Sequence, residues 1–220
     1  MANIDFLSKI HKKTSRNYIE RVVAHDKAEC AAIAKRFDRD YWDGERQYGY
    51  GGYKYDGRWR VVADEMTAHY QLEAGQKILD VGCGKGFLLY EFTQAVHGIE
   101  ASGIDISQYA IDNSKEEIRP RLMRGLAQDL PYPDGYFDFV YSITTLHNLY
   151  VNDLKKAVQH IERVSKGKSY ILVEAYRNER EKANLLYWQL TCECFYTPAE
   201  WEWLFNEWGY TGDYGFIYFE

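Results

Sequence analysis

The feature that most constrains the fold is a regular alternation of short apolar runs and amphipathic helical stretches from residue 75 onward. Apolar runs of strand length occur at 77–81, 101–106, 137–143 and 169–176, with a weaker third strand around 122–127 and a last one at 214–219. The segments between them repeat apolar residues at helical spacing. Strands joined by crossover helices pair in parallel and need helices on both faces. The sequence therefore predicts an α/β domain whose ligands bind at the carboxyl ends of the strands.

The first 60 residues do not follow this pattern. Residues 1–40 carry apolar positions at helical spacing, whereas residues 41–59, YWDGERQYGYGGYKYDGRW, are rich in tyrosine and glycine. So much glycine predicts a loop rather than a regular element. We expect residues 1–60 to form an N-terminal helical extension with an aromatic lid, and residues 61–220 to form the main domain.

A glycine-rich turn directly after the first predicted strand carries the most specific signal. It reads LDVGCGKG and contains Asp80, Gly82, Gly84 and Gly86. Glycines in such a turn let backbone amides approach a ligand closely. The order D-x-G-x-G-x-G differs from the G-x-G-x-x-G dinucleotide fingerprint, and the sequence has no G-x-x-x-x-G-K-[ST] phosphate loop. The spacing therefore argues against both of those nucleotide sites.

Two further acidic positions follow the next two predicted strands. Asp105 lies at the end of the second strand, where a carboxylate can accept both hydroxyls of a ribose. The third strand is followed by Gln128-Asp129-Leu130-Pro131. An acid followed by an apolar residue can receive an adenine amino group there and cover its ring. Three loops at strand ends therefore predict a site for an adenosyl group.

In these motifs the chain resembles the class I S-adenosylmethionine-dependent methyltransferases, in particular the small-molecule type 11 branch that includes ubiquinone and menaquinone methylases. The resemblance covers roughly Gly75 to Glu174, including AQDLPYPDGYFDFVYS at 127–142. It implies a three-layer α/β/α Rossmann-like sheet, mostly parallel, with an antiparallel strand at the C-terminal edge. It also implies S-adenosyl-L-methionine as cofactor, S-adenosyl-L-homocysteine as product, and no metal.

The resemblance also implies roles for the cofactor-binding residues. In that family, the residues that correspond to Asp80 through Gly86 hold the methionine part of the cofactor. The residue that corresponds to Asp105 binds the ribose diol, and the one that corresponds to Asp129 contacts adenine. Together with their neighbours, the expected cofactor-binding residues are Asp80, Gly82, Cys83, Gly84, Asp105, Ile106, Ala127, Gln128, Asp129, Leu130 and Ser142.

Two residues are candidates for catalysis. His147 lies in the loop after the fourth predicted strand, where this family approaches the methyl acceptor, and its reference pKa suits a general base. A packed or capping histidine is the alternative interpretation. Glu174, at the end of the fifth strand, can pair with an ammonium group or act as the base. The alternative for Glu174 is a salt bridge to Arg177 or Lys182.

Further candidates are expected around the acceptor. Tyr48, Tyr50, Tyr53 and Tyr55 are expected to form a lid that closes over both ligands and excludes water, or a loop packed permanently on the core. Asn148 orients the acceptor or starts a turn, and Arg177 clamps a carboxylate or phosphate or is a solvated charge. The expected substrate and lid residues are Tyr48, Tyr50, Tyr53, Tyr55, Asn148, Tyr176 and Arg177.

Composition limits the partners. The chain has 27 Lys and Arg against 33 Asp and Glu, a net charge of −6, which disfavours a polyanion held by bulk charge. No stretch approaches the roughly 20 apolar residues of a membrane span, and the cysteines lack CxxC spacing. We expect a cytoplasmic protein with a small-molecule substrate and neither nucleic acid nor membrane as partner. Trp201, Trp203 and Trp208 are interpreted as packing residues or a self-association face, which leaves a homodimer open.

The predicted function is methyl transfer from S-adenosylmethionine to an oxygen or nitrogen atom of a small molecule by direct displacement. A sulfonium methyl is already activated, so the enzyme mainly has to place the acceptor in line. Two alternatives stay open. One is a catalytically inactive scaffold or regulator that binds the cofactor. The cofactor-binding residues do not distinguish it from an active enzyme, because both would contain them. The other is an NAD-type oxidoreductase on a related sheet, against which the glycine spacing argues.

Overall fold

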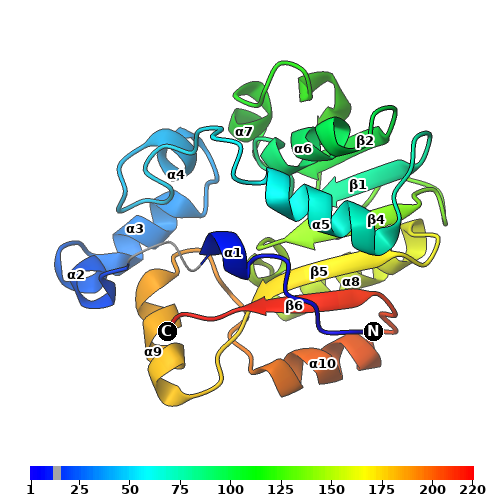
Figure 1. The fold of residues 1–220 in the computed structure, drawn as a ribbon. Coiled ribbons are helices and arrows are strands. Elements are labelled where there is room, and N and C mark those ends of the chain that lie inside the picture. The colour runs from blue at the N-terminus through cyan, green and yellow to red at the C-terminus, as the bar shows by residue number, and fades with distance from the viewer. Residues whose placement is uncertain (12–15) are drawn as a thin grey trace.

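The computed structural model describes residues 1–11 and 16–220. Within them, six strands form one sheet in the order β3-β2-β1-β4-β5-β6 (Figure 1). The strands are β1 (Lys77–Val81), β2 (Glu100–Asp105), β3 (Leu122–Arg124), β4 (Phe139–Ile143), β5 (Ser169–Glu174) and β6 (Asp213–Ile217). The strand order reverses between β1 and β4. This is the topological switch point of a doubly wound sheet, where ligands bind at the carboxyl ends of the strands.

Helices cover both faces of the sheet (Figure 1). The main-domain helices are α5 (Arg60–Tyr70), α6 (Phe87–Ala95), α7 (Gln108–Asp112), α8 (Val151–Val164), α9 (Glu179–Trp188) and α10 (Pro198–Glu207), with 3-10 turns at Arg119–Arg121 and Leu146–Asn148. Helices α5 and α6 contribute to one hydrophobic core, and α8 and α10 contribute to another. The predicted three-layer α/β/α architecture is confirmed.

Neighbouring residues of the central strands enter different cores. In β4, Phe139 and Tyr141 pack in the core with α5 and α6, whereas Val140 packs in the core with α8 and α10. Successive side chains of a strand point to opposite faces. A strand that is buried on both faces therefore reads as a continuous apolar run, which is why these strands were visible in the sequence.

The C-terminal edge of the sheet differs from the prediction. Strand β6 pairs in parallel with β5, with Tyr170 opposite Asp213, and every strand pair in the described residues is parallel. The expected antiparallel strand is therefore wrong here. Helices α9 and α10 carry the chain back past the sheet before β6 begins, so β6 enters from the same end as β5. The outer edge of β6 is covered by the N-terminal residues, where Asn3 bridges to Tyr214.

The N-terminal segment is helical, as predicted, but in short pieces. These are α1 (Ser8–His11), α2 (Tyr18–Val23), α3 (Lys27–Ala34) and α4 (Arg39–Asp43). Residues 12–15 of the predicted helical range lie outside the described residues. The side chains of Asn17, Asp26 and Asp38 are the N-caps of α2, α3 and α4, respectively. Figure 1 shows α2 to α4 and the loop after them at the end of the sheet to which the β1 arrowhead points. We refer to residues 16–59 as the cap.

Helix α10 begins and ends at the predicted signals. Thr197 and Glu200 form a capping box, and Gly209 adopts φ 74° just beyond the helix. Trp201 is buried in the core, and its indole N–H donates to the backbone carbonyl of Glu174 at 3.0 Å. The helix is thereby fastened to the carboxyl end of β5.

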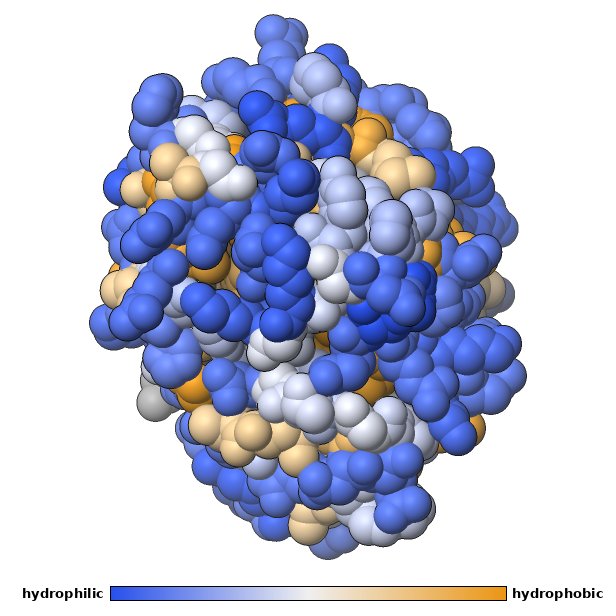
Figure 2. Space-filling model, turned by 90° about the vertical axis from the view of Figure 1, so that its right-hand side faces the viewer, coloured by the Kyte–Doolittle hydropathy of each residue, from blue (hydrophilic) through white to orange (hydrophobic). Residues whose placement is uncertain are grey.

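Figure 2 shows the end of the molecule opposite the cap. Hydrophilic residues dominate this face, and hydrophobic residues appear on it only in small separate patches. No helix among the described residues has the length and apolar content needed to cross a membrane. The same residues contain no cluster of three His, Cys, Asp or Glu side chains placed for a metal ion. The features that point to a ligand lie at the other end.

Trp201 and Trp203 give a matched test of the packing of α10. The Trp201 side chain is fully buried, whereas Trp203 is 60% exposed. Trp201→Ala removes a large buried ring and its hydrogen bond, so the free energy of unfolding is expected to fall by about 3–5 kcal/mol. Trp203→Ala is expected to change it by less than about 0.5 kcal/mol. Urea unfolding followed by circular dichroism measures both values, and equal losses would contradict this packing.

Candidate functional site

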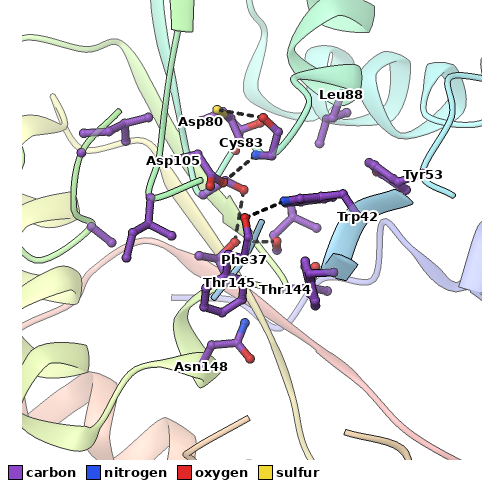
Figure 3. Close-up of a pocket in the computed structure, with 18 of the residues that line it drawn as sticks. Phe37, Trp42, Tyr53, Asp80, Cys83, Leu88, Asp105, Thr144, Thr145 and Asn148 are labelled. Atoms are coloured by element: carbon purple, nitrogen blue, oxygen red, sulfur yellow. Dashed lines mark hydrogen bonds between the residues drawn. The ribbon is translucent and has the colours of Figure 1, made fainter. Parts of the chain in front are cut away.

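A pocket opens between the cap and the carboxyl ends of β1, β2 and β4. Figure 3 shows Trp42 and Tyr53 of the cap on one side of it and Asp80 and Asp105 of the sheet on the other. Thr145 lies at its β4 side. The pocket is at the switch point of the sheet, which is where the fold predicts a ligand.

Two glycines of the β1 turn let other segments approach its backbone. Gly82 has φ 85°, and a Cβ atom there would lie 2.2 Å from the side chain of Thr145. Gly84 has φ 53°, and a Cβ atom there would lie 2.7 Å from the ring of Trp42. Any larger residue would strain the backbone and collide. The turn therefore requires glycine in order to contact the β4 loop on one side and the cap on the other.

Asp105 joins the β1 turn to the start of α7. Its two carboxylate oxygens accept hydrogen bonds from the backbone N–H groups of Gly84 and Ser107, each at 2.7 Å. Burial raises the pKa of Asp105, and these two amides oppose the rise. A carboxylate has about four lone-pair sites, so Asp105 keeps acceptor capacity toward the pocket. It is suited to hydroxyl donors such as those of a diol.

Asp80 is a second buried acid in the same pocket. Burial raises its pKa to about 8; the Tyr141 hydroxyl acts against this rise, and the negative charge of Asp105 adds to it. A cation in the pocket stabilises the ionised form of such a carboxylate. The site next to the β1 turn is therefore suited to a positively charged ligand.

Two amide side chains of the pocket have a buried oxygen atom that accepts no hydrogen bond from the described residues. These atoms are Gln128 Oε1, after β3, and Asn148 Oδ1, after β4. An unsatisfied buried acceptor costs about 1–3 kcal/mol, so such atoms are uncommon in folded proteins. They favour a ligand that carries N–H donors.

The cap is fastened onto the main domain. The Tyr53 ring stacks on Phe87 of α6, with centroids 5.0 Å apart. The buried ammonium of Lys85 binds both carboxylate oxygens of Asp43, at 2.8 and 2.6 Å, and the Tyr53 carbonyl at 2.9 Å. In this structure the aromatic segment therefore lies closed over the pocket.

A second pocket adjoins the first. The residues that line both pockets are Tyr41, Tyr50, Tyr53, Trp59 and Thr144. Thr144, directly after β4, has φ 51°, which is rare for a β-branched residue. Strained backbone of this kind persists only where the surrounding structure enforces it, and it occurs often at functional sites. The junction of the two pockets is therefore a place where two ligands can meet.

Glu174 and His147 form a buried pair beside the second pocket. Glu174 lines that pocket, and burial raises its pKa to about 8, although the Gln189 amide and the Arg16 charge lower it. His147 Nδ1 accepts from the Glu174 N–H at 3.4 Å, so the ring proton lies on Nε2, 3.5 Å from the Glu174 carboxylate. Burial lowers the pKa of His147 to about 3. The imidazole is therefore neutral and is oriented toward the acid.

The first pocket brings together most of the residues expected at the site. It contains Asp80, Gly82, Cys83, Gly84, Asp105, Ile106, Ala127, Gln128, Tyr50, Tyr53 and Asn148. These residues come from loops at four strand ends and from the cap. The convergence of the three predicted loops is the part of the site that spacing alone had indicated.

Other expected residues lie elsewhere. Asp129 is exposed, and Leu130 and Ser142 are buried, the Ser142 hydroxyl donating to the Val81 carbonyl at 2.8 Å. Arg177 pairs with Glu181 and Glu220 rather than with Glu174. The expected residues that line neither pocket are Asp129, Leu130, Ser142, His147, Tyr48, Tyr55, Tyr176 and Arg177.

The sequence analysis did not name several residues that line the two pockets. They include Phe37, Tyr41, Trp42, Trp59, Thr144, Thr145 and the arginines of the second pocket. For the cap residues a signal was present, because Tyr41, Trp42 and Trp59 flank the glycine-rich segment that was expected to cover the site. For the arginines, which are scattered along the first 60 residues, no spacing distinguishes them from solvated charges.

Comparison with known proteins places a family match on the strands that form the site. Residues 79–173 match the family model described as a methyltransferase domain. The chain is 32% identical over 119 residues to the uncharacterized methyltransferase sll0829 of Synechocystis sp., covering 53% of each chain. It is 31% identical over 128 residues to the demethylmenaquinone methyltransferase of Symbiobacterium thermophilum, covering 54% of this chain and 50% of that one. The chain thus spans about half the length of these curated relatives.

Solved structures share the fold. The YcgJ protein from Bacillus subtilis superposes with a TM-score of 0.55 at 23% identity and covers 66% of each chain. A chain of the Haloferax volcanii complex between the Trm112 methyltransferase activator and a methyltransferase gives a TM-score of 0.54 at 21% identity, over 69% of this chain and 76% of that one. At these identities the likeness shows the fold.

Gly84→Ala tests the contact between the β1 turn and the cap. The added methyl group meets the Trp42 ring while φ must stay at 53°, so backbone strain of about 1–2 kcal/mol adds to overpacking of about 1–3 kcal/mol. Gly57→Ala is the matched control, because φ is 76° there and the nearest side-chain atom is 4.0 Å away. We expect the free energy of unfolding to fall clearly more in Gly84→Ala. Equal losses in denaturant unfolding would show that the contact is absent.

Proposed function

Since residues 79–173 belong to the methyltransferase domain family and the sheet has the class I methyltransferase fold, we propose that this chain transfers a methyl group from S-adenosylmethionine to an oxygen or nitrogen atom of a small molecule. One observation carries the proposal. The β1 glycine turn, Asp105 after β2 and Gln128 after β3 line a single pocket, and each offers what one part of that cofactor needs.

The residues of the first pocket fit the cofactor part by part. Asp105 keeps lone pairs for the ribose hydroxyls. The unpartnered Gln128 Oε1 suits the adenine amino group, and we assign this contact to Gln128 because Asp129 is exposed outside the pocket. Gly82 and Gly84 line the same pocket beside Asp80, and we assign the methionine part of the cofactor to this turn. When bound, S-adenosylmethionine supplies a methyl group that its sulfonium already activates, so the protein has to place the acceptor and take its proton.

The cap supplies the other wall of the cofactor site. Trp42 and Tyr53 present aromatic rings to the pocket, and such rings attract a cation through their quadrupole. Asp80 adds a carboxylate on the opposite side. A closed aromatic wall also excludes water from the site. We therefore propose that the N-terminal extension, residues 1–60, completes the active site through the cap.

Glu174 is the proposed base. It lines the second pocket together with Thr144, which also lines the first, so an acceptor between them lies beside the cofactor pocket. When the acceptor atom displaces S-adenosylhomocysteine from the methyl carbon, so that the bond from sulfur to the methyl carbon breaks, the acceptor's proton would pass to the Glu174 carboxylate. His147 lines neither pocket and is neutral at physiological pH. We assign it as a positioning residue whose Nε2–H faces that carboxylate.

A small molecule is the proposed acceptor. Aromatic side chains of the cap, including Tyr41 and Trp59, line the second pocket, and a pocket enclosed in this way suits a compact ligand. A macromolecule would have to reach Glu174 past this wall. The cytoplasmic location and the homodimer stay predictions.

Asp105→Ala tests the cofactor site. Loss of the carboxylate is expected to weaken binding of S-adenosylhomocysteine by at least about tenfold, or about 1.4 kcal/mol, when measured by calorimetry on protein whose fold is checked by circular dichroism. Asp129→Ala is the control, because that carboxylate is exposed and lines neither pocket. Unchanged binding in Asp105→Ala, or an equal loss in Asp129→Ala, would refute the assignment.

Glu174→Gln tests the base. Because the pKa of Glu174 is about 8, the ionised fraction rises with pH, and the rate of methyl transfer is expected to increase up to about pH 8 and then level off. Glu174→Gln should remove this increase of the rate with pH and lower the rate by about a hundredfold, while the affinity for the cofactor stays unchanged. The acceptor is found by mass spectrometry as a gain of one methyl group from pooled phenols, amines and acids. A wild-type rate in Glu174→Gln removes the residue from the mechanism.

A further inference from the structure

The second pocket concentrates positive charge. The basic residues that line it are His11, Arg16, Arg21, Arg46, Lys54 and Arg58, and the acidic ones are Asp56 and Glu174. Arg58 is paired with Asp56, its Nε donating at 2.7 Å. The chain as a whole carries a net charge of −6. The excess of arginine is therefore a local property of this pocket and not a consequence of composition.

Three of these arginines surround one aromatic ring. The guanidinium carbons of Arg16, Arg21 and Arg46 lie 5.4, 4.6 and 5.2 Å from the centroid of Trp188. Arg21 belongs to α2 and Trp188 ends α9, while Arg46 follows α4. Cation–π contacts hold the guanidinium groups at the ring. The fold thus gathers three cations from separate segments at one wall of the pocket.

Arg21 and Arg46 are oriented by carbonyl groups. Arg21 donates to the Trp188 carbonyl at 2.7 Å and to the Arg46 carbonyl at 3.2 Å, and Arg46 donates to the Gly49 carbonyl at 2.5 Å. In the part of the chain that the structure describes, no carboxylate lies within 4.0 Å of either guanidinium. Carbonyl partners fix the direction of a guanidinium but leave its charge uncompensated. Both groups also retain further N–H donors.

A bound anion would stabilise this group of cations. Burial and the Arg46 charge lower the pKa of Arg21, and burial lowers the pKa of Arg16, which shows that their charged forms are destabilised where they lie. The planar guanidinium group matches carboxylate and phosphate oxygens in a bidentate manner. An oxyanion between Arg21 and Arg46 would offset the repulsion between the two guanidinium groups and the cost of burying Arg21.

We propose that the methyl acceptor is a small organic acid whose carboxylate or phosphate binds between Arg21 and Arg46. This inference rests on the proposed methyltransferase function. Arg21 and Arg46 line only the second pocket, whereas Thr144 lines both. The oxyanion therefore binds away from the cofactor pocket, and the group that is methylated extends toward Thr144 and Glu174. Tyr41, Tyr50 and Trp188 line the space between and favour a flat or aromatic body.

Calorimetric titration tests the proposal on the full chain saturated with S-adenosylhomocysteine. The probes are 4-hydroxybenzoate, 4-hydroxyphenyl phosphate and the neutral 4-hydroxybenzamide. At least one of the two anions is expected to bind at least about tenfold more tightly than the amide, with an affinity that falls as salt is added. Tighter binding of the benzoate identifies a carboxylate acceptor, and tighter binding of the phosphate identifies a phosphorylated one.

Arginine variants locate the anion. Arg46→Met removes the charge, and Arg21→Lys keeps a charge but loses the planar fork; each is expected to weaken anion binding by about tenfold without changing S-adenosylhomocysteine affinity. Arg121→Met, at an exposed arginine that lines neither pocket, is the control for net charge. Thermal unfolding checks that the variants fold. If one of the two arginine variants does not fold, the other still tests the proposal.

Two failures are distinguishable. Equal affinity for all three probes, or unchanged anion affinity in both Arg46→Met and Arg21→Lys, overturns the acid-binding proposal while leaving methyl transfer intact. Absence of S-adenosylhomocysteine binding to the wild-type chain overturns the proposed function. In that case the same probes are titrated without it, and preference for the anions still decides whether the arginine pocket binds an oxyanion.

Discussion

The geometry of the site depends on a buried hydrogen-bond network centred on Asp105. The carboxylate accepts from the amides of Gly84 and Ser107, and the Ser107 hydroxyl accepts from the indole N–H of Trp42 at 2.9 Å. One acid at the end of β2 therefore fixes the β1 turn, the start of α7 and the cap relative to one another. Charge-assisted hydrogen bonds of this kind are short and strong when they are shielded from water. The same carboxylate that organises the pocket is the one that we expect to contact the ligand.

The two pockets contain buried acids with different tasks. Asp80 and Glu174 both have pKa values raised to about 8 by burial. Asp80 lies in the aromatic pocket, where a bound cation would stabilise its ionised form. Glu174 lies in the arginine-rich pocket, where we propose that it takes a proton from the acceptor. Under the proposed function, the fold separates the site for a positively charged ligand from the site for a negatively charged one, and Thr144 lines both pockets.

The division between the sheet and the cap explains which properties are shared with relatives. The family match covers residues 79–173, which contain the glycine turn, Asp105 and Gln128. The cap and its arginines precede this match and line one side of the second pocket, and residues 188–191 after the match also line it. Under the proposed function, the matched domain would bind the cofactor, and the cap would contribute to the choice of acceptor. The Lys85 to Asp43 ion pair holds these two parts together.

Much of the fold and the cofactor loops could be predicted from the sequence because they depend on local rules. A strand buried on both faces has to be apolar throughout, and a turn with φ 85° at Gly82 and 53° at Gly84 needs glycine. The direction of β6 could not be predicted, because it depends on where α9 and α10 return the chain. Asp129 was expected at the site because only its position after a strand was visible, and not its exposure.

The sequence by itself determined the alternation of strands and helices, the glycine turn and the acid at the end of β2, since each is set by residues close together in the chain. Only the tertiary structure decided that Trp42 closes the pocket, that burial keeps His147 neutral, and that Arg21 and Arg46 meet Trp188. These contacts join distant segments and depend on packing and desolvation, which no spacing in a sequence encodes.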